Sequence, residues 1–393
     1  MKVAVVGGGP AGSEVAAGLA KGGAETFLFD SSFDREKPCG GGAPWRCESE
    51  FPHLISEDIP CTTIRRVLFE APSRAVAVVE LPHPLRIFSR RTLDSRLAAR
   101  AARAGATLVE EKVVSVGVLP GAGATPGEDR PRRRLRLRTA SGREEMFDHI
   151  VGADGARSVV RRMLASPFPA GDLTQTVGCY LPGRTDDTAR ISFAEGLNGY
   201  LWSFPRTDHL AVGACAPLQS IAASDLGTIL RSFLERLGLG LDLPPLPFCS
   251  ALVPTLSPEG LAANRIAGEG WSLVGDAGGL VDPLTREGLH SAMKSASLAA
   301  EALLQEHPGA YAGRLEALFG EEMRWASSRR DRFFDPETTE RLVRILDGSH
   351  AVRAVMADLV AGRQRYLTLK RRLLRKAVPA AFQIAWRHVL GAV

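Results

Sequence analysis

The start of the chain sets the strongest limit on its fold, because a short apolar run, a glycine-rich turn and a helical segment follow one another there. The run from Lys2 to Val6, KVAVV, is rich in β-branched residues, which is typical of a buried parallel strand. The turn GGGPAG leads into GSEVAAGLAKGG, which predicts a helix, and the next apolar run ends in Asp30. This order predicts a βαβ unit, and hence an α/β protein with a parallel sheet.

The glycines of this turn have the spacing Gly-x-Gly-x-x-Gly, at Gly7, Gly9 and Gly12. In such a turn the first glycine allows the tight bend, the second lets the backbone approach a pyrophosphate, and the third lets the helix pack closely. The helix N-terminus adds unpaired N–H groups and a partial positive charge. Asp30 stands where it can accept from ribose hydroxyls. We therefore predict a dinucleotide site whose adenosine carries no 2′-phosphate.

Two further glycine–aspartate turns occur far along the chain. Asp154 and Gly155 follow one predicted strand, whereas Gly275 and Asp276 follow another, ahead of a helix start near Glu287. An NAD site does not need all three turns. FAD extends its pyrophosphate, ribityl chain and isoalloxazine ring across several strand ends of one sheet, so the three turns together predict FAD.

The middle of the chain continues the nucleotide-type domain. The segment from Arg90 to Ala104 predicts a helix, with Thr92 as its capping residue. We expect three strands between Val113 and Val151, the first two joined by the loop GAGATPGEDRP. The alternation RLRLR at 134–138 suits a strand with one solvated face. Its charged side chains then lie on the protein surface and do not indicate a nucleic-acid site.

A separate antiparallel sheet is predicted next, followed by helices. Several short strand-like runs lie over 174–216, a helix lies near 222–238 and another strand near 247–255, and helical patterns occupy most of the chain from Glu287. The fold class is thus α/β, a Rossmann-type domain with an inserted sheet domain and a helical C-terminus. The predicted division is an FAD-binding domain at 1–60, 86–165 and 263–310, a substrate domain at 61–85 and 166–262, and a helical region at 311–393.

Positive charge is concentrated at the C-terminal end. The net charge is +5, but the stretch from Arg363 to Val393 holds eight Lys or Arg and no acidic residue. A nucleic-acid binder carries its basic excess on the folded body, so we expect no nucleic-acid partner. Apolar residues recur there at helical spacing behind a basic cluster: Val378, Phe382, Ala385 or Trp386 and Val389, after Lys370, Arg371, Arg372, Arg375 and Lys376. We favour a terminal helix packed on the body; the alternative is a stripe resting on an anionic membrane surface.

The cysteines and the apolar runs indicate a reducing, cytoplasmic setting. No two of the six cysteines form a CxxC pair, so we expect neither a metal site nor a disulfide framework. No apolar run approaches eighteen residues, and the first residues lack a secretory signal pattern. Contact with a membrane would then be peripheral, through the basic C-terminal end.

The order of these motifs resembles the FAD-dependent p-hydroxybenzoate hydroxylase superfamily over roughly residues 1–300. GGGPAG is followed by RTLD at 91–94, by the Asp-Gly pair at 154–155 and by the Gly-Asp pair at 275–276. Within that superfamily, KPCGGG at 37–42 and YLWSFP at 200–205, with Gly213 following, resemble the geranylgeranyl reductase family, which saturates isoprenoid double bonds on lipids and chlorophyll precursors.

The resemblance implies how FAD is held. Asp30 and Arg91 would contact the adenosine side, Asp276 the ribityl chain, and the helix start at Gly288 and Leu289 would face the pyrimidine ring, where its dipole favours the anionic reduced flavin. Backbone at the three glycines after Cys39 would lie against the ring. The full set expected to bind FAD is Gly7, Gly9, Pro10, Ala11, Gly12, Asp30, Gly40, Gly41, Gly42, Arg91, Val113, Asp154, Gly155, Gly275, Asp276, Gly288 and Leu289.

Four residues are candidates for the substrate side: Cys39, Tyr200, Trp202 and Arg286. Cys39 is either a proton donor or a small buried hydrophobic residue. Tyr200 and Trp202 alternate on a predicted strand, so they point to one face and can wall the substrate cavity; plain sheet packing is the alternative. Their string also resembles the WxWxIP element of flavin-dependent halogenases.

This chain departs from the family pattern at two positions. Arg286 and Cys215 stand where the family usually carries glycine. Arg286 would place a cation beside the flavin or at the pocket edge, where it binds an anionic substrate group or reinforces the flavin charge. The usual polyprenyl substrate is therefore an open question.

The sequence predicts an FAD-dependent oxidoreductase that reduces carbon–carbon double bonds of an apolar, isoprenoid-like substrate. No second unit of strand, Gly-x-Gly-x-x-Gly turn and helix is found for a nicotinamide, since GAGATPG at 121–127 lies in a predicted loop. Electrons are therefore expected from transiently bound NAD(P)H or from a redox partner protein. One alternative is a monooxygenase or halogenase acting through a flavin hydroperoxide. The other is a flavin-carrying protein that binds lipids without catalysis.

Overall fold

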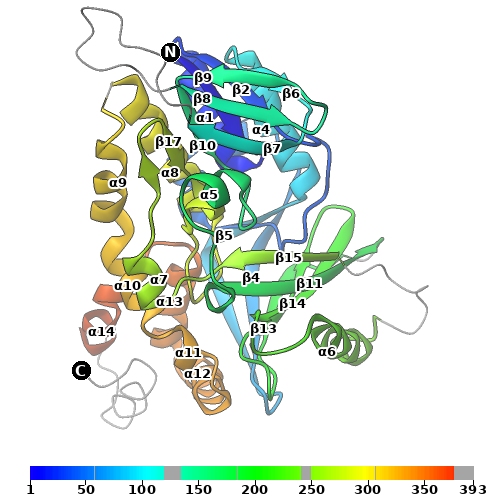
Figure 1. The fold of residues 1–393 in the computed structure, drawn as a ribbon. Coiled ribbons are helices and arrows are strands. Elements are labelled where there is room, and N and C mark those ends of the chain that lie inside the picture. Colours follow the sequence, from blue (N-terminus) through cyan, green and yellow to red (C-terminus); the bar gives the residue numbers. More distant parts are fainter. Residues whose placement is uncertain (57, 119–133, 184, 240–248, 306, 376–393) are drawn as a thin grey trace, which may run out of the picture.

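The computed structural model describes residues 1–56, 58–118, 134–183, 185–239, 249–305 and 307–375. The described residues form three sheets, of six, eight and three strands, together with a group of C-terminal helices (Figure 1). The loop GAGATPGEDRP and the apolar stripe expected after Arg375 lie outside the described residues. The fold class predicted from the sequence is confirmed.

The first sheet is parallel and carries the glycine-rich turn. Its order is β16-β17-β10-β1-β2-β6, and every neighbouring pair is parallel except β16 with β17. The strands are β1 (Lys2–Val6), β2 (Glu25–Phe29), β6 (Thr107–Val109), β10 (His149–Gly152), β16 (Ala267–Gly268) and β17 (Trp271–Leu273). Both faces are buried, which explains the continuous apolar run of β1.

Alternate residues of β1 belong to the cores on opposite faces of this sheet. Val3 and Val5 pack in the cluster of α1 (Pro10–Lys21) and α8 (Leu289–Leu304). Ala4 and Val6 pack in the cluster of a small three-stranded sheet. That sheet consists of β7 (Val113–Val118), β8 (Leu135–Thr139) and β9 (Glu144–Phe147).

The three strands expected before Val151 form, with one difference. On β8 Leu135 and Leu137 are buried while Arg136 and Arg138 are exposed, as the alternation predicts. The last run breaks at Asp148, so β9 and β10 belong to different sheets. A tertiary contact stabilises the break, because the Asp148 carboxylate accepts from the N–H of Lys2 at 2.7 Å and so binds the turn to the start of β1.

The second sheet has eight strands in the order β15-β11-β14-β13-β12-β4-β5-β3, antiparallel except where β12 meets β4. The strands are β3 (Gly42–Ala43), β4 (Cys61–Glu70), β5 (Val76–Phe88), β11 (Leu173–Pro182), β12 (Thr188–Ser192), β13 (Tyr200–Pro205), β14 (His209–Pro217) and β15 (Cys249–Pro254). The helix expected near 222–238 is α6 (Ala223–Arg236), which packs on β11 and β14.

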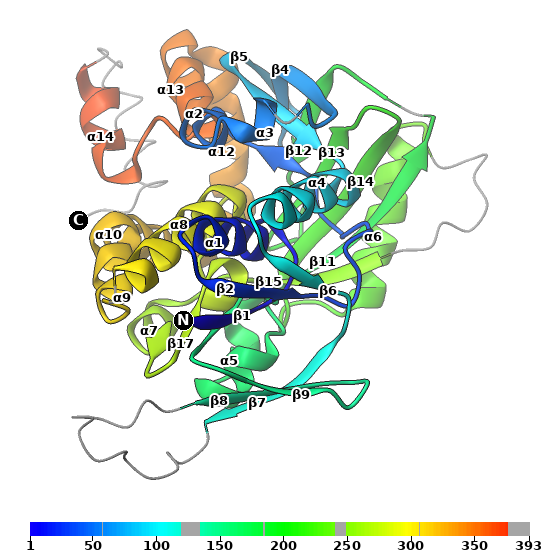
Figure 2. The same cartoon turned by 90° about the horizontal axis from the view of Figure 1, so that it is seen from above.

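The C-terminal helices cover the part of this sheet formed by β4 and β5, as Figure 2 shows for α12 and α13. Buried leucines and valines of these helices share one core with the strands. The helices after α8 are α9 (Ala310–Leu315), a π-helical turn (Glu316–Gly320), α10 (Glu321–Ser327), α11 (Arg330–Phe333), α12 (Pro336–Gly348), α13 (His350–Val360) and α14 (Tyr366–Arg375). Shorter helices elsewhere are α2 (Trp45–Glu50), α3 (His53–Ser56), α5 (Val159–Leu164) and α7 (Pro258–Ala262).

The helix predicted from Arg90 is α4 (Arg90–Arg103), but Thr92 does not cap it. The Glu36 carboxylate accepts from the N–H groups of Arg90 at 3.0 Å and Arg91 at 3.2 Å, and from the Ser89 hydroxyl at 2.6 Å. An acidic side chain distant in sequence thus satisfies the first turn of α4.

Among the described residues, no helix combines the length and the apolar character needed to cross a bilayer. The same residues contain no group of three or more His, Cys, Asp or Glu side chains arranged to hold a metal ion. All six cysteines are free thiols.

Candidate active site

The turn between β1 and α1 brings bare backbone to the carboxyl edge of the first sheet. Gly7 has φ +107°, and a Cβ there would lie 2.4 Å from the Ala153 carbonyl oxygen. A Cβ at Gly12 would lie only 1.7 Å from the Gly7 carbonyl oxygen. At Gly9, which caps α1, the nearest atom to an added Cβ is instead the Lys37 Nζ, at 3.1 Å. Gly7 and Gly12 therefore shape the turn, while Gly9 faces the cavity.

Cationic side chains gather over this turn. Arg90 forms a two-pronged pair with Asp94, with N···O distances of 2.9 and 3.0 Å, and Lys37 Nζ lies 3.4 Å from the same carboxylate. Burial lowers the Lys37 pKa, although Asp94 opposes the shift. Burial on its own would lower the Arg90 pKa, but the interactions of Arg90 with Asp94 and Cys39 outweigh burial. The Arg90 pKa therefore lies above its usual value. Two cations against one carboxylate favour an anion at the start of α1.

Asp30 ends β2 at the rim of the same cavity. Its Oδ2 accepts from the Gly8 N–H at 2.6 Å and from Arg35 at 3.0 Å. Arg91, expected beside it, points away: its side chain is 60% exposed, pairs with Asp34 and does not line the cavity. The preceding residue, Arg90, lines the cavity instead, because the pair between Arg90 and Asp94 sets which side of α4 faces inward. Of these two arginines, Arg90 is the one placed to meet a ligand in the cavity, near the glycine turn.

The other two glycine–aspartate turns reach the cavity as well. Asp154 caps α5, since its Oδ2 accepts from the Val159 N–H at 2.6 Å, and Gly155 adopts φ +78°. Asp276 is half-buried near Arg90 and Lys37. Burial raises its pKa, and the two cations oppose that shift.

A loop of three glycines lines the centre of the cavity. Gly41 has φ +83°, and a Cβ there would lie 2.1 Å from the Phe88 carbonyl oxygen. A Cβ at Gly40 would lie 2.6 Å from the Phe204 ring, whereas Gly42 has more room. Far from this loop in the sequence, Gly288 is the N-cap residue of α8 and also lines the cavity. The backbone thus leaves a space that side chains would fill.

Three residues that the sequence did not single out hold this glycine loop in place. Arg206, fully buried, donates to the Cys39 carbonyl oxygen at 2.6 Å and pairs with Glu36 at 2.8 Å. The Tyr180 hydroxyl donates to the Lys37 carbonyl oxygen at 2.6 Å. Burial acts to raise the Glu36 pKa, but Arg206, the Ser89 hydroxyl and the Arg91 N–H together outweigh it, so the carboxyl pKa lies below its usual value. The one available signal was that Arg206 follows YLWSFP directly.

Replacing Arg206 by methionine is expected to loosen the loop. Loss of the cation leaves Glu36 without its partner, at roughly 3 kcal/mol of stability, the lower end for a buried pair because Glu36 keeps some contact with solvent. Chemical denaturation and FAD titration measure the two effects. Arg91→Met breaks an exposed pair instead and should change stability by no more than about 0.5 kcal/mol. Equal effects of the two variants would contradict the anchoring role.

Aromatic residues of β13 line the far part of the cavity. Tyr200 and Trp202 are in edge-to-face contact with ring centres 6.1 Å apart, and Tyr200 stacks on Phe334 of the segment after α11. The Tyr200 hydroxyl donates to the Thr285 carbonyl oxygen at 2.8 Å. Gly213 makes room for the indole, since a Cβ there would lie 2.2 Å from the Trp202 ring. Both aromatic side chains therefore belong to the cavity wall as well as to the sheet.

Glu287, an acidic residue that no sequence motif marked, follows Arg286 in the chain. Glu287 lines the cavity, and its Oε1 accepts from the His290 N–H at 2.9 Å in the first turn of α8. Burial raises the pKa of Glu287 to about 7. Asp282 holds the turn before it and accepts from the Tyr366 hydroxyl at 2.8 Å. No residue pattern marked Glu287, because its pKa depends on burial that only the fold supplies.

These parts open into one cavity of about 1500 Å³. That volume exceeds the roughly 300–1,000 Å³ of a pocket for one ordinary ligand, so two molecules can lie end to end. Its far end, between the second sheet and the C-terminal helices, is lined by Phe69, Leu85, Phe193, Leu342, Met356 and Leu369. Of the residues expected to bind cofactor or substrate, Gly12, Arg91 and Gly275 are absent from the lining. Gly12 and Gly275 instead allow close packing around α1.

Solved structures share this fold. A geranylgeranyl bacteriochlorophyll reductase-like protein from Thermoplasma acidophilum superimposes with a TM-score of 0.74 at 22% identity, covering 95% of this chain and 98% of that chain. A flavin-dependent brominase superimposes with a TM-score of 0.69 at 16% identity, covering 96% and 99%. These likenesses show the fold, which is also that of a halogenase solved in complex with FAD, at a TM-score of 0.65 and 16% identity.

Sequence relatives narrow the class. No family model matches the chain. Digeranylgeranylglycerophospholipid reductase 2 of Methanothermobacter thermautotrophicus is 30% identical over 361 residues, 88% of each protein. Menaquinone reductase of Mycobacterium tuberculosis is 31% identical over 323 residues, 77% of this chain and 76% of that protein. The chloroplastic geranylgeranyl diphosphate reductase of rice is 31% identical over 326 residues, and the match spans 66% of its length. The chain belongs to the geranylgeranyl reductase family.

Proposed function

We propose that this protein reduces carbon–carbon double bonds of an apolar, isoprenoid-like substrate. The observation that carries the proposal is the single cavity that runs from the glycine turn at Gly9 to an apolar end between β5 and the C-terminal helices. The relatives support it, since each is named as a reductase of an isoprenoid compound or of menaquinone.

The residues present fit FAD. Gly9, Lys37 and Arg90 would hold the pyrophosphate, Asp30 the adenosine ribose and Asp276 the ribityl chain, and Gly40 to Gly42 would leave space for the ring. When bound and reduced, FAD supplies a hydride to one carbon of the double bond. The donor of its electrons would be NAD(P)H bound in passing, or a redox partner protein.

The chain itself would position the substrate and keep water away. Tyr200 and Trp202 form one wall beside the glycine loop, and leucine and phenylalanine side chains cover the apolar end. Such a lining binds a hydrocarbon chain by removing it from water, at about 25 cal/mol per Å² of apolar surface.

The second carbon of the double bond needs a proton, and we propose Glu287 as its source. Glu287 lines the cavity at the N-terminus of α8. Because its pKa is about 7, a large share of the protein molecules carry a proton on this carboxyl group at neutral pH. Burial raises the Tyr200 pKa well above its usual value, so that hydroxyl gives up its proton less readily. Cys39 stays the competing candidate, since it also lines the cavity.

The test is anaerobic reduction of the FAD-loaded protein, followed by mass analysis of products from a panel of polyprenyl substrates. The expected product gains two hydrogens. Turnover that begins only when air is admitted, with oxygen or halide in the product, would establish the monooxygenase or halogenase alternative. A reduced flavin that persists with every substrate would establish the lipid-binding alternative.

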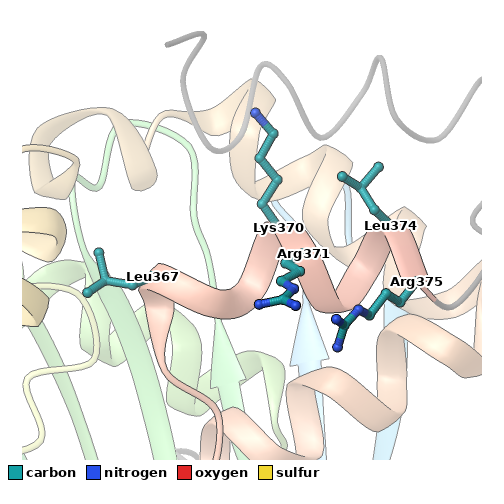
Figure 3. Close-up of a pocket in the computed structure, with 5 residues that line it drawn as sticks. All are labelled: Leu367, Lys370, Arg371, Leu374 and Arg375. Carbon is teal, nitrogen blue, oxygen red and sulfur yellow. The ribbon is translucent and has the colours of Figure 1, made fainter.

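We also propose peripheral contact with an anionic lipid surface through α14. Leu369 and Leu373 bury one side of this helix against the body, whereas Leu367 and Leu374 are 41% and 49% exposed. Figure 3 shows these two leucines on one helix with Lys370, Arg371 and Arg375. Exposed apolar groups beside basic ones suit anionic lipid. The protein should float with phosphatidylglycerol vesicles and the double variant K370E/R371E should not; absence of flotation by the unaltered protein would refute the contact.

A further inference from the structure

Arg286 places a cation inside the cavity on an unusual backbone. Its φ is +56°, in the left-handed region that glycine enters readily and other residues avoid. Among the described residues only Asp58 and Arg74 share this feature outside glycine, and neither lines the cavity. The resemblance drawn from the sequence implies glycine at this position, and glycine would adopt this backbone without strain. A strained residue at a site points to a role for its side chain.

The Arg286 guanidinium lies against two aromatic rings, while the neighbouring Glu287 carboxylate accepts a hydrogen bond at the start of α8. The guanidinium lies 4.3 Å from the centre of the Phe334 ring and 5.5 Å from that of Tyr200. One nitrogen donates to the Leu284 carbonyl oxygen at 3.1 Å, while the buried Nε has no hydrogen-bond partner. No described carboxylate forms an ion pair with it. The side chain is only partly buried, but its Nε is shielded from solvent and unpaired, so an anion that binds beside the guanidinium would be stabilised.

We propose that Arg286 binds an anionic group of the substrate, a phosphate or a carboxylate at the end of the apolar chain. This inference rests on the proposed function and names the substrate class. A guanidinium suits both groups, because its planar fork pairs with two oxygens. The side chain lies among Tyr200 and Phe334, on the side of the second sheet and the C-terminal helices, whereas Lys37 and Arg90 serve the glycine turn at the other end.

The test compares substrates that differ only in the head group: geranylgeranyl diphosphate, geranylgeranoic acid and geranylgeraniol. Arg286→Gly should lower kcat/KM for the diphosphate and the acid by roughly 10- to 100-fold, the range of one charge-assisted contact, and leave the alcohol unchanged. Arg286→Lys should recover part of the loss. The diphosphate and the acid separate the two anion chemistries. A loss that is the same for all three substrates would overturn the inference.

The matched control is Arg74→Gly, which makes the same replacement at an exposed residue with φ +74° far from the lining. It should alter no substrate. The midpoint potential of bound FAD is a second readout: we expect no shift in Arg286→Gly, and a shift with equal losses would assign Arg286 to the flavin charge instead.

Binding separates this inference from the proposed function. If the unaltered protein reduces none of the three probes, the proposed function fails, and calorimetry on the oxidised FAD-loaded protein still decides the role of Arg286. Tighter binding of the diphosphate than of the alcohol, lost in Arg286→Gly, would support the inference. Equal affinities for the two probes would refute it.

Discussion

Replacing Gly12 by alanine should produce a folded protein that binds FAD poorly. A Cβ at this position would lie 1.7 Å from the Gly7 carbonyl oxygen, a backbone atom that cannot turn aside. The turn must shift, and overpacking of this kind costs roughly 1–3 kcal/mol. Because we propose that the same turn holds the pyrophosphate, we expect the shift to lower FAD affinity by about 5- to 150-fold. Fluorescence titration with FAD measures it.

A second glycine provides the control for this variant. Gly313 lies in the short helix α9, is exposed, and has no atom within 4 Å of an added Cβ. Gly313→Ala should keep full FAD affinity and gain slightly in stability, because alanine favours a helix more than glycine does. If Gly12→Ala bound FAD as tightly as the unaltered protein, the turn described here would not be the pyrophosphate site.

Replacing Glu287 by glutamine should slow substrate reduction by roughly 10²- to 10⁴-fold, the usual contribution of a positioned general acid. Glutamine keeps the oxygen that accepts from the His290 N–H, so the start of α8 should persist. Single turnover of the pre-reduced protein under nitrogen isolates this step from flavin reduction. The control is Glu301→Gln, on the exposed side of the same helix, and it should leave the rate of substrate reduction unchanged.

The pH dependence of the rate gives the sign of the effect. Glu287 has a pKa of about 7, so the unaltered protein should lose activity as pH rises through 7, while E287Q should show no such step. A variant Cys39→Ser that lost the rate while E287Q kept it would transfer the role to Cys39.

The same group should affect folding stability in the same direction. Its pKa is raised above the unfolded value, so the folded state holds more protons between about pH 4.5 and 7. Stability therefore falls as pH rises through that window, and it changes little below it. Denaturant titrations of the unaltered protein and of E287Q at pH 5 and pH 8 should show the difference.

Local patterns predicted the elements that depend on neighbours in sequence. KVAVV and the glycine turn gave β1 and α1, and the alternation of arginine and leucine gave β8 with its one solvated face. The aspartates at strand ends reached one cavity because parallel strands share a carboxyl edge.

Features set by tertiary contacts escaped prediction. Glu36 caps α4 and pairs with Arg206, although the two are distant in the chain, so no spacing rule connects them. Whether Arg90 or Arg91 faces the cavity depends on the rotation of α4 about its axis. The periodicity of the sequence does not define that rotation to within one residue. The division at Asp148 depended on its bond to Lys2 in another strand.

The hydroxyl of Tyr366 ties the first turn of α14 to Asp282, which in turn shapes the segment bearing Arg286 and Glu287. A displacement of α14, the last described helix, would therefore shift the segment that carries the two proposed functional residues. A purification tag, a reporter fusion or a nearby proteolytic cut that displaces α14 should change the reaction rate before it lowers the free energy of unfolding.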